Sequence, residues 1–454
     1  MQEAGAVMRH FVTHQVVQSL LLRRTPRRSR HSKMQPAGSS EQTHCSTYGT
    51  PQYARHMIDL TASLLPGDDD AFRREIRAWL NDHPRPTGEQ LARRGLVAPH
   101  WPRPWGLDAS PIEQLLVDDE LRRAGVQRPA NPIGIGWAGP TIVMAGTQEQ
   151  KDRYLFDLLS GEHFWCQLFS EPESGSDLAS LRTSAVRDGD EWVINGQKIW
   201  TSAAQYAQFG ILLARTDPRA DKHHGITYFI CPMRASGIEV RPIREMTGGA
   251  TFNEVFFTNV RIPHANVVGD VHDGWRLARV TLGNERVSLS TGGALWGRGP
   301  TAMDVVDAAR ALRASGKALD VMTRDAVTRL YLQHVLLELI RTRTLVQRLA
   351  GAEPGPEASV RKIMADEHGQ EVMEVGQRLV GATAMLLGAT SADLPREVAM
   401  FASREWAQGA LFSRALTIGG GTGEVQRNIL AERVLGLPRD AAPTTLSAHG
   451  NQAS

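Results

Sequence analysis

Three short stretches of the chain combine hydroxyl, glycine and aromatic residues in a way that could support chemistry. They read Phe169-Ser-Glu-Pro-Glu-Ser-Gly-Ser-Asp177, Ile194-Asn-Gly-Gln-Lys-Ile-Trp-Thr-Ser202 and Gly421-Thr-Gly-Glu-Val-Gln-Arg427. Their serines could donate hydrogen bonds, and Trp200 could offer a flat apolar wall to a planar ring. A Ser-Glu-Pro loop or a glycine turn is common loop chemistry on its own. Three such stretches in this order are much more specific.

Together, these stretches resemble the acyl-CoA dehydrogenase superfamily. The first resembles that family's xTEPxAGSD flavin loop, although Glu173 and Ser174 stand where smaller residues are usual, and the second resembles its NGxKxWITN strand. The third continues through Ala431-Glu-Arg-Val-Leu-Gly-Leu-Pro438, and the resemblance covers residues 58–439. It implies an FAD enzyme of lipid metabolism, such as β-oxidation, which removes a proton and a hydride from adjacent carbons of an acyl-CoA thioester.

The resemblance also implies which residues contact the flavin. Ser170 would donate a hydrogen bond to the ring, Ser202 would bond its N5 edge, and Trp200 would stack near it. The alternative for Trp200 is an ordinary aromatic residue of the sheet core. The implied cofactor-binding residues are Gln167, Phe169, Ser170, Gly175, Ser176, Trp200, Ser202, Gln377, Gly381, Thr422 and Glu424.

The catalytic base implied by the resemblance is Glu285. Removal of the α-proton of an acyl thioester needs a carboxylate poised over the α-carbon. Many family members place this glutamate just before the last motif, where this chain has Gly420, whereas others carry it in an LxxER helix that here reads Leu282-Gly-Asn-Glu285-Arg286. The alternative for Glu285 is a surface residue of an amphipathic helix.

Substrate contacts are implied at Ser176, Arg286 and Gly420. Arg286 would help to anchor the polar part of the acyl-CoA. Although Gly420 has no side chain, its backbone N–H could still polarise the thioester oxygen, as a main-chain N–H does at this position in the family. Hydride would then pass from the β-carbon to flavin N5.

Two segments depart from the family pattern. The RxxFG segment that reaches the FAD pyrophosphate of a neighbouring subunit has no counterpart in Leu312–Arg324, and the usual QxxGGxG reads Gln377-Arg-Leu-Val-Gly-Ala-Thr383. One explanation is a hetero-oligomer, dimer or tetramer, in which a related subunit supplies the arginine clamp, as in some bacterial steroid side-chain dehydrogenases of this superfamily. The other is a homo-oligomer that holds FAD through Arg313, Lys317 or Arg324.

Other functions of the same fold stay open. A flavin monooxygenase or oxidase would use oxygen in place of an electron-transfer flavoprotein, which is the expected electron acceptor here. A non-catalytic partner subunit would also explain the missing clamp.

The elements that must position these residues are helical, then β-rich, then helical again. Apolar spacing predicts helices near Phe72–Leu80 and at 112–123, 139–145 and 148–159. Short β-rich runs follow at 191–199, 208–215, 225–232, 238–243 and 253–262. Long helical patterns then cover 275–292, 323–350, 356–387, 396–416 and 424–433. No GxGxxG motif follows a strand, which argues against a Rossmann site.

We therefore predict an α+β fold with a central antiparallel β-barrel. The expected units are a basic leader (1–56), an N-terminal helical domain (57–163), the flavin-facing barrel (164–274), a C-terminal four-helix bundle (275–440) and a flexible tail (441–454).

Composition supports a globular enzyme. Of the 454 residues 41% are hydrophobic and 22% charged, and the net charge of +2 does not indicate a nucleic-acid partner. No apolar run is long enough for a membrane span. Three scattered cysteines and histidines without ligand spacing predict neither disulfides nor a metal site. A cytoplasmic location is expected, or the mitochondrial matrix if the Arg-rich leader is a transit peptide.

Overall fold

The computed structural model describes residues 65–289, 299–349, 355–356, 358–381 and 404–439, and both the predicted leader and the predicted tail lie outside these ranges. The described chain begins with five α-helices, four of which lie where the apolar spacing predicts them. Four of the five α-helix starts are capped: Asp70 accepts a hydrogen bond from the Arg73 N–H, and Thr87, Ser110 and Thr147 form capping boxes. The helices are α3 (Ala71–Asp82), α4 (Gly88–Arg93), α5 (Pro111–Ala124), α6 (Gly139–Ala145) and α7 (Gln148–Ser160), with the π-helix η2 (Gly134–Ala138) before α6.

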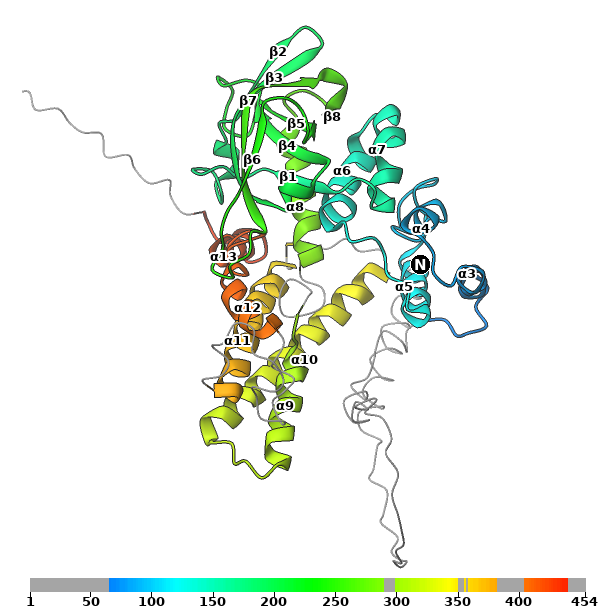
Figure 1. The fold of residues 1–454 in the computed structure, drawn as a ribbon, viewed down its shortest axis with the longest axis vertical. Coiled ribbons are helices and arrows are strands. Elements are labelled where there is room, and N and C mark those ends of the chain that lie inside the picture. The colour runs from blue at the N-terminus through cyan, green and yellow to red at the C-terminus, as the bar shows by residue number, and fades with distance from the viewer. Residues whose placement is uncertain (1–64, 290–298, 350–354, 357, 382–403, 440–454) are drawn as a thin grey trace, which may run out of the picture. The chain divides into compact units, whose positions relative to one another are not determined.

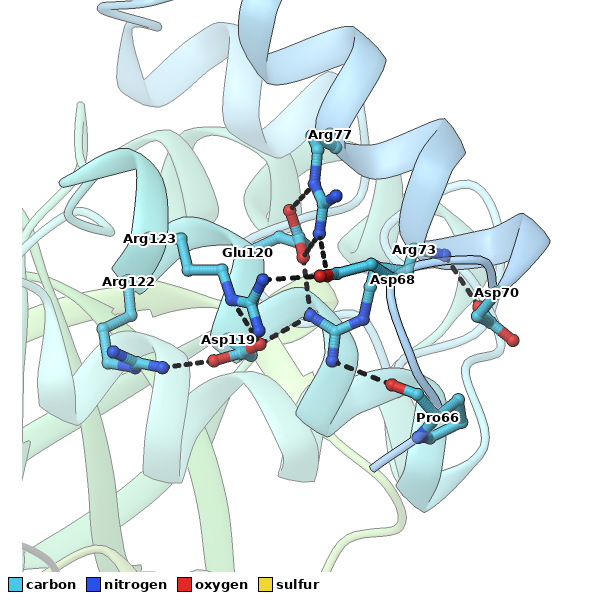
Figure 2. A network of polar contacts seen from close by, with 9 residues as sticks. All are labelled: Pro66, Asp68, Asp70, Arg73, Arg77, Asp119, Glu120, Arg122 and Arg123. Carbon is cyan, nitrogen blue, oxygen red and sulfur yellow. Dashed lines mark hydrogen bonds and ion pairs between the residues drawn. The ribbon is translucent and has the colours of Figure 1, made fainter. Parts of the chain in front are cut away.

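A buried ion network joins α3 to α5. Arg73 bonds Asp119 at 2.5 Å and Glu120 at 2.6 Å, while Arg77 donates two hydrogen bonds of 2.8 Å to the Glu120 carboxylate. Figure 2 shows these side chains meeting between the two helices, with Asp68 bridging Arg77 and Arg123 at the solvent side. The network fixes how the two helices pack, because guanidinium–carboxylate bonds are directional.

Eight strands form the sheet: β1 (Trp165–Leu168), β2 (Ser184–Asp188), β3 (Glu191–Ser202), β4 (Phe209–Arg215), β5 (Ile226–Pro232), β6 (Ile238–Pro242), β7 (Phe252–Pro263) and β8 (Val267–Val268). Their order is β6-β7-β3-β2-β4-β5-β8, with β1 paired to β4 (Figure 1). The five strands expected from the alternation of apolar residues are all present.

The predicted antiparallel barrel is wrong in two respects. Residues 164–274 are all described, and within them the edge strands β6 and β8 do not pair with each other, so the sheet stays open. Closure needs continuous hydrogen bonding between edge strands, and β8 has two residues. The sheet is also mixed, because β1 and one residue pair of β2 run parallel to β4.

The remaining described helices are α8 (Gly274–Leu289), α9 (Ala302–Ala314), α10 (Val321–Leu349), α11 (Ala358–Val380), α12 (Arg404–Phe412) and α13 (Gly423–Arg433). A helical C-terminal domain is thus confirmed, whereas residues 382–403, which the predicted four-helix bundle includes, lie outside the described ranges. Helix α8 packs on β5, η2 and α6, so it joins the sheet to the N-terminal helices. None of the described helices is long and apolar enough to cross a membrane.

Candidate active site

The first two sequence stretches are joined by a buried ion pair. Lys198 Nζ lies 2.8 Å from Glu171 Oε1 and donates a second bond of 3.0 Å to the Phe169 carbonyl. Lys198 has an exposed fraction of 0%, which makes it one of the largest fully buried side chains. Burial lowers the pKa of Lys198 to about 8, although Glu171 opposes the shift. Burial would raise the pKa of Glu171, but the charge and hydrogen bond of Lys198 outweigh it and lower that pKa, which favours the carboxylate.

Trp200 projects from an irregularity in β3. The pairing of β3 with β7 shifts register between Lys198 and Thr201, and the Ile199 N–H bonds the Ser170 carbonyl at 2.9 Å. Trp200 itself has a φ of +60°, which is rare for a bulky residue and costs about 1–3 kcal/mol, a kind of strain that is common at functional sites. Its side chain is 58% exposed. The alternative of a sheet-core aromatic is therefore wrong.

Two serine hydroxyls on the segments next to Trp200 have no hydrogen-bond partner among the described residues. Ser170 and Ser202 are both half-buried, and among the described residues neither side chain has a hydrogen-bond partner. Gly175 and Ser176 lie exposed in the loop after β1, whereas Gln167 is half-buried within β1. The Phe169 ring, in contrast, is buried against Tyr228 with ring centroids 6.0 Å apart. Its side chain therefore belongs to the core.

A buried hydroxyl network fixes α8, the helix that contains Glu285. Thr281 Oγ1 lies 2.8 Å from Thr141 Oγ1 and 3.1 Å from the Tyr228 hydroxyl, so one contact joins α8, α6 and β5. Glu285 follows Thr281 by four residues and thus lies on the same helix face. The side chains of Glu285 and Arg286 fall outside the part of the chain that the structure describes.

The glycine turn before α13 has free backbone donors. Gly420 and Gly421 have φ angles of +66° and +91°, and their N–H groups have no hydrogen-bond acceptor among the described residues. The buried Gln426 side chain donates to their carbonyls at 3.3 and 3.5 Å. Thr422 caps α13, and Glu424 in its first turn has a pKa lowered by the backbone N–H there. Successive free N–H groups of this kind form an acceptor-binding turn.

An aromatic series connects Trp200 to the helix that leads into this turn. Trp200 and Phe252 lie edge to face at 6.1 Å, and Phe252 stacks with Phe412 of α12 at 6.5 Å. The second and third sequence stretches are therefore linked through side chains of the sheet and α12.

Two predicted cofactor residues lie elsewhere in the helical domain. Gln377 is half-buried in the last turns of α11, and Gly381 ends that helix with a φ of +74°. A Cβ added to Gly381 would meet no atom of the described residues within 4 Å, and its positive φ is typical of a glycine that ends a helix. Arg313 at the end of α9 and Lys317 in the following loop are exposed. No described interaction brings these four residues to Trp200 or Ser170.

Sequence reasoning missed the roles of Lys198, Glu171, Thr281 and Gln426. A partial signal for Lys198 was present, because Trp192 and Ile194 are buried alternate residues of β3 and Lys198 lies four residues further along, past the exposed Gly196. A lysine at an inward position requires a buried anion nearby. Among the described residues, no group of three or more His, Cys, Asp or Glu side chains could hold a metal ion.

Three family models match the chain in succession. The acyl-CoA dehydrogenase N-terminal domain matches residues 69–162, the middle domain residues 166–260 and the C-terminal domain residues 272–435. FadE34 of Mycobacterium tuberculosis is 46% identical over 77% of this chain, which spans about half (46%) of that relative. IpdE1 of the same organism is 36% identical over 83% of this chain and 91% of its own length.

Solved structures of the same family have a similar fold and, in two cases, a similar sequence. The "Tcur3481-Tcur3483 steroid ACAD" has a TM-score of 0.66 and 32% identity, over 81% of this chain and 97% of that chain. The "ChsE4-ChsE5 complex from Mycobacterium tuberculosis" has a TM-score of 0.64 and 32% identity over the same shares. A glutaryl-CoA dehydrogenase of Mycobacterium smegmatis in complex with FADH2, at 18% identity and a TM-score of 0.62 over 84% of this chain and 98% of that one, shares the fold. On these sequence matches, the chain belongs to the acyl-CoA dehydrogenase family of oxidoreductases.

Proposed function

We propose that the chain catalyses FAD-dependent α,β-dehydrogenation of an acyl-CoA to the 2-enoyl-CoA. The observation that carries this proposal is Trp200, held outside the core in a strained conformation on a segment that bonds the Ser170 carbonyl and continues to Ser202, two serines whose hydroxyls have no partner among the described residues. A planar ring with polar edges needs this combination of a flat apolar wall and flanking donors.

These residues fit a flavin. Ser170 and Ser202 would donate to the ring edge, Trp200 would cover one side, and Gly175 and Ser176 would line the approach of its chain. When bound, FAD supplies the acceptor for the β-hydride. Gln167, Thr422 and Glu424 are proposed to complete the cofactor site, and the electrons are proposed to leave to an electron-transfer flavoprotein.

The proton step is assigned to Glu285. Its place on the face of α8 that Thr281 anchors supports this role, and the missing carboxylate at Gly420 leaves the position of the usual base empty. The N–H of Gly420, which has no acceptor among the described residues, would donate to the thioester oxygen, and one such donor typically stabilises a transition state by about 3–4 kcal/mol. Arg286 would hold the polar part of the substrate.

Replacement of Glu285 by Gln tests the proton step. We expect Glu285→Gln to bind FAD as the wild type does but to lose the bleaching of the flavin by acyl-CoA under anaerobic conditions. Glu191→Gln, at a half-buried residue paired with Arg261 on the surface of the sheet, is the matched control and should leave bleaching intact. Full bleaching by Glu285→Gln would contradict the assigned base. Oxygen consumption at the rate of turnover would instead point to an oxidase.

A non-identical subunit and a bulky substrate are proposed on separate grounds. The RxxFG segment has no counterpart in Leu312–Arg324, which supports a clamp supplied by a related subunit. Leu332, Leu336, Leu339 and Val346 repeat along α10 and are exposed, so this helix has an apolar face available for a related chain. The similarity to a complex described as a steroid ACAD makes steroid-derived CoA esters the first substrates to test.

The FAD occupancy of the purified chain distinguishes a homo-oligomer from a hetero-oligomer with a related subunit. We expect the purified chain to hold little FAD alone and to reach full occupancy when mixed with a paralogous subunit, with a matching increase in mass by light scattering. Leu336→Glu should prevent that increase. Full occupancy of the isolated chain would count against a partner.

A further inference from the structure

We infer that Lys198 and Glu171 are positioning residues, an ion pair that holds the flavin-facing loop and the Trp200 segment in register with each other. The inference rests on the proposed function for what the loop binds, but the geometry of the pair is independent of it.

The Lys198–Glu171 pair makes hydrogen bonds to the backbone at both ends of the loop 170–181. At its start, Lys198 Nζ donates to the Phe169 carbonyl at 3.0 Å. At its end, the Glu171 carboxylate accepts the N–H groups of Arg182 at 2.6 Å and Thr183 at 2.9 Å. The loop therefore begins and ends on a single ion pair.

The same pair controls the placement of the two side chains proposed to face the ring. Ser170 lies between Phe169 and Glu171, so bonds on both neighbours restrict its backbone. Trp200 follows Lys198 by two residues, and the bond from the Ile199 N–H to the Ser170 carbonyl connects the two segments directly. If the pair is lost, Ser170 and Trp200 no longer have a fixed separation.

Stability alone does not explain a charged pair at this position. The Lys198 side chain is fully buried and that of Glu171 nearly so, and a well-packed apolar pair is often as stable as a buried ion pair of the same volume. What an apolar pair cannot supply is directional bonds to three backbone groups. This difference separates a positioning role from a merely structural one.

The discriminating experiment is a comparison of Lys198→Met, Glu171→Met and the double variant. Each single variant leaves one buried charge without its partner and should unfold at a lower temperature. The double variant should recover most of the wild-type melting temperature. Its FAD affinity should nevertheless fall by about tenfold or more, with a changed flavin absorbance band, because the loop is no longer preorganised. Arg261→Met, which breaks exposed ion pairs of the same sheet, is the control and should bind FAD normally.

Hydrogen exchange of the flavin-free protein provides the second readout. In the double variant, amides of residues 170–181 should exchange faster than in the wild type, and amides of β4 should not change. Wild-type exchange in this loop, or wild-type FAD affinity in the double variant, would overturn the inference. If the wild type itself binds no FAD with or without a partner, the proposed function fails, and the exchange result still decides whether the pair orders the loop.

Discussion

The ion network between α3 and α5 allows one stability effect to be worked out from the structure. Glu120 receives one hydrogen bond from Arg73 and two from Arg77, and it is 2% exposed. Its pKa is lowered, first by the bond from Arg77 and then by Arg73 against the effect of burial. Glu120→Gln removes the charge and turns an amide donor toward guanidinium donors, so it should destabilise the N-terminal helices.

The destabilisation caused by Glu120→Gln depends on which carboxylates remain bonded to Arg73 and Arg77. Removing one member of a buried ion pair typically costs about 3–5 kcal/mol, because the other charge is left uncompensated. Arg73 keeps Asp119 at 2.5 Å, and Arg77 keeps Asp68 at 2.8 Å. Both guanidinium groups therefore retain a carboxylate, and we expect the free energy of unfolding to fall by about 3 kcal/mol, at the lower end of that range.

Chemical denaturation with circular dichroism measures this loss, and Asp68→Asn is the matched control. Asp68 bonds Arg77 and Arg123 in the same network but is exposed to solvent (Figure 2), so screening should leave its replacement with little effect. The double variant Arg73→Met with Glu120→Leu should be more stable than Glu120→Gln, because no unpaired charge remains. Equal stability of Glu120→Gln and Asp68→Asn would refute the reasoning.

Three further predictions concern buried polar groups. Burial lowers the pKa of Lys198 to about 8, so FAD affinity should fall as the pH rises through 8 and Lys198 loses its charge, a dependence that a titration of Lys198→Met should lack. His368 has a pKa lowered to about 4 by burial and by His334, so its share of stability is present above pH 6.5 and lost toward pH 4. That share, about 3 kcal/mol, should disappear from the pH profile of unfolding in His368→Gln. Thr281→Val should cost about 1–2 kcal/mol in the free energy of unfolding, since it leaves Thr141 and Tyr228 hydroxyls without their shared partner.

Local patterns were sufficient for most elements. The apolar spacing of α3 and α7 and the alternation in β3 and β7 predict these elements to within a few residues, because each buries one regular face. The closed barrel could not be predicted correctly, since closure depends on whether two edge strands far apart in the sequence pair with each other. The shortness of β8 and the parallel entry of β1 are long-range outcomes that no single strand pattern contains.

The sequence motifs indicate some residues of the candidate site, whereas the contacts between its segments are visible only in the structure. The motifs indicate Ser170, Trp200 and Ser202, and the structure adds that Trp200 is exposed and strained, a property of the register shift opposite β7. The pairing of Lys198 with Glu171 requires the loop after β1 to lie beside β3, and this contact is set by the tertiary structure. Only the inward position of Lys198 gave a local hint.

The segments of the proposed site are connected by hydrogen bonds and ion pairs, because polar contacts have directions that apolar contacts lack. Hydrophobic burial holds each unit together but is non-directional, so it does not fix the angle between a ring-binding wall and a helix that offers a base. The bonds of Lys198 to the loop, of Thr281 to β5 and α6, and of the buried Lys362 of α11 to the Leu416 carbonyl after α12 all have defined directions. Conservative changes at these polar contacts should therefore reduce ligand affinity more than they reduce the stability of the fold. Changes in the apolar core, such as those at Ile194 or Leu213, should do the reverse.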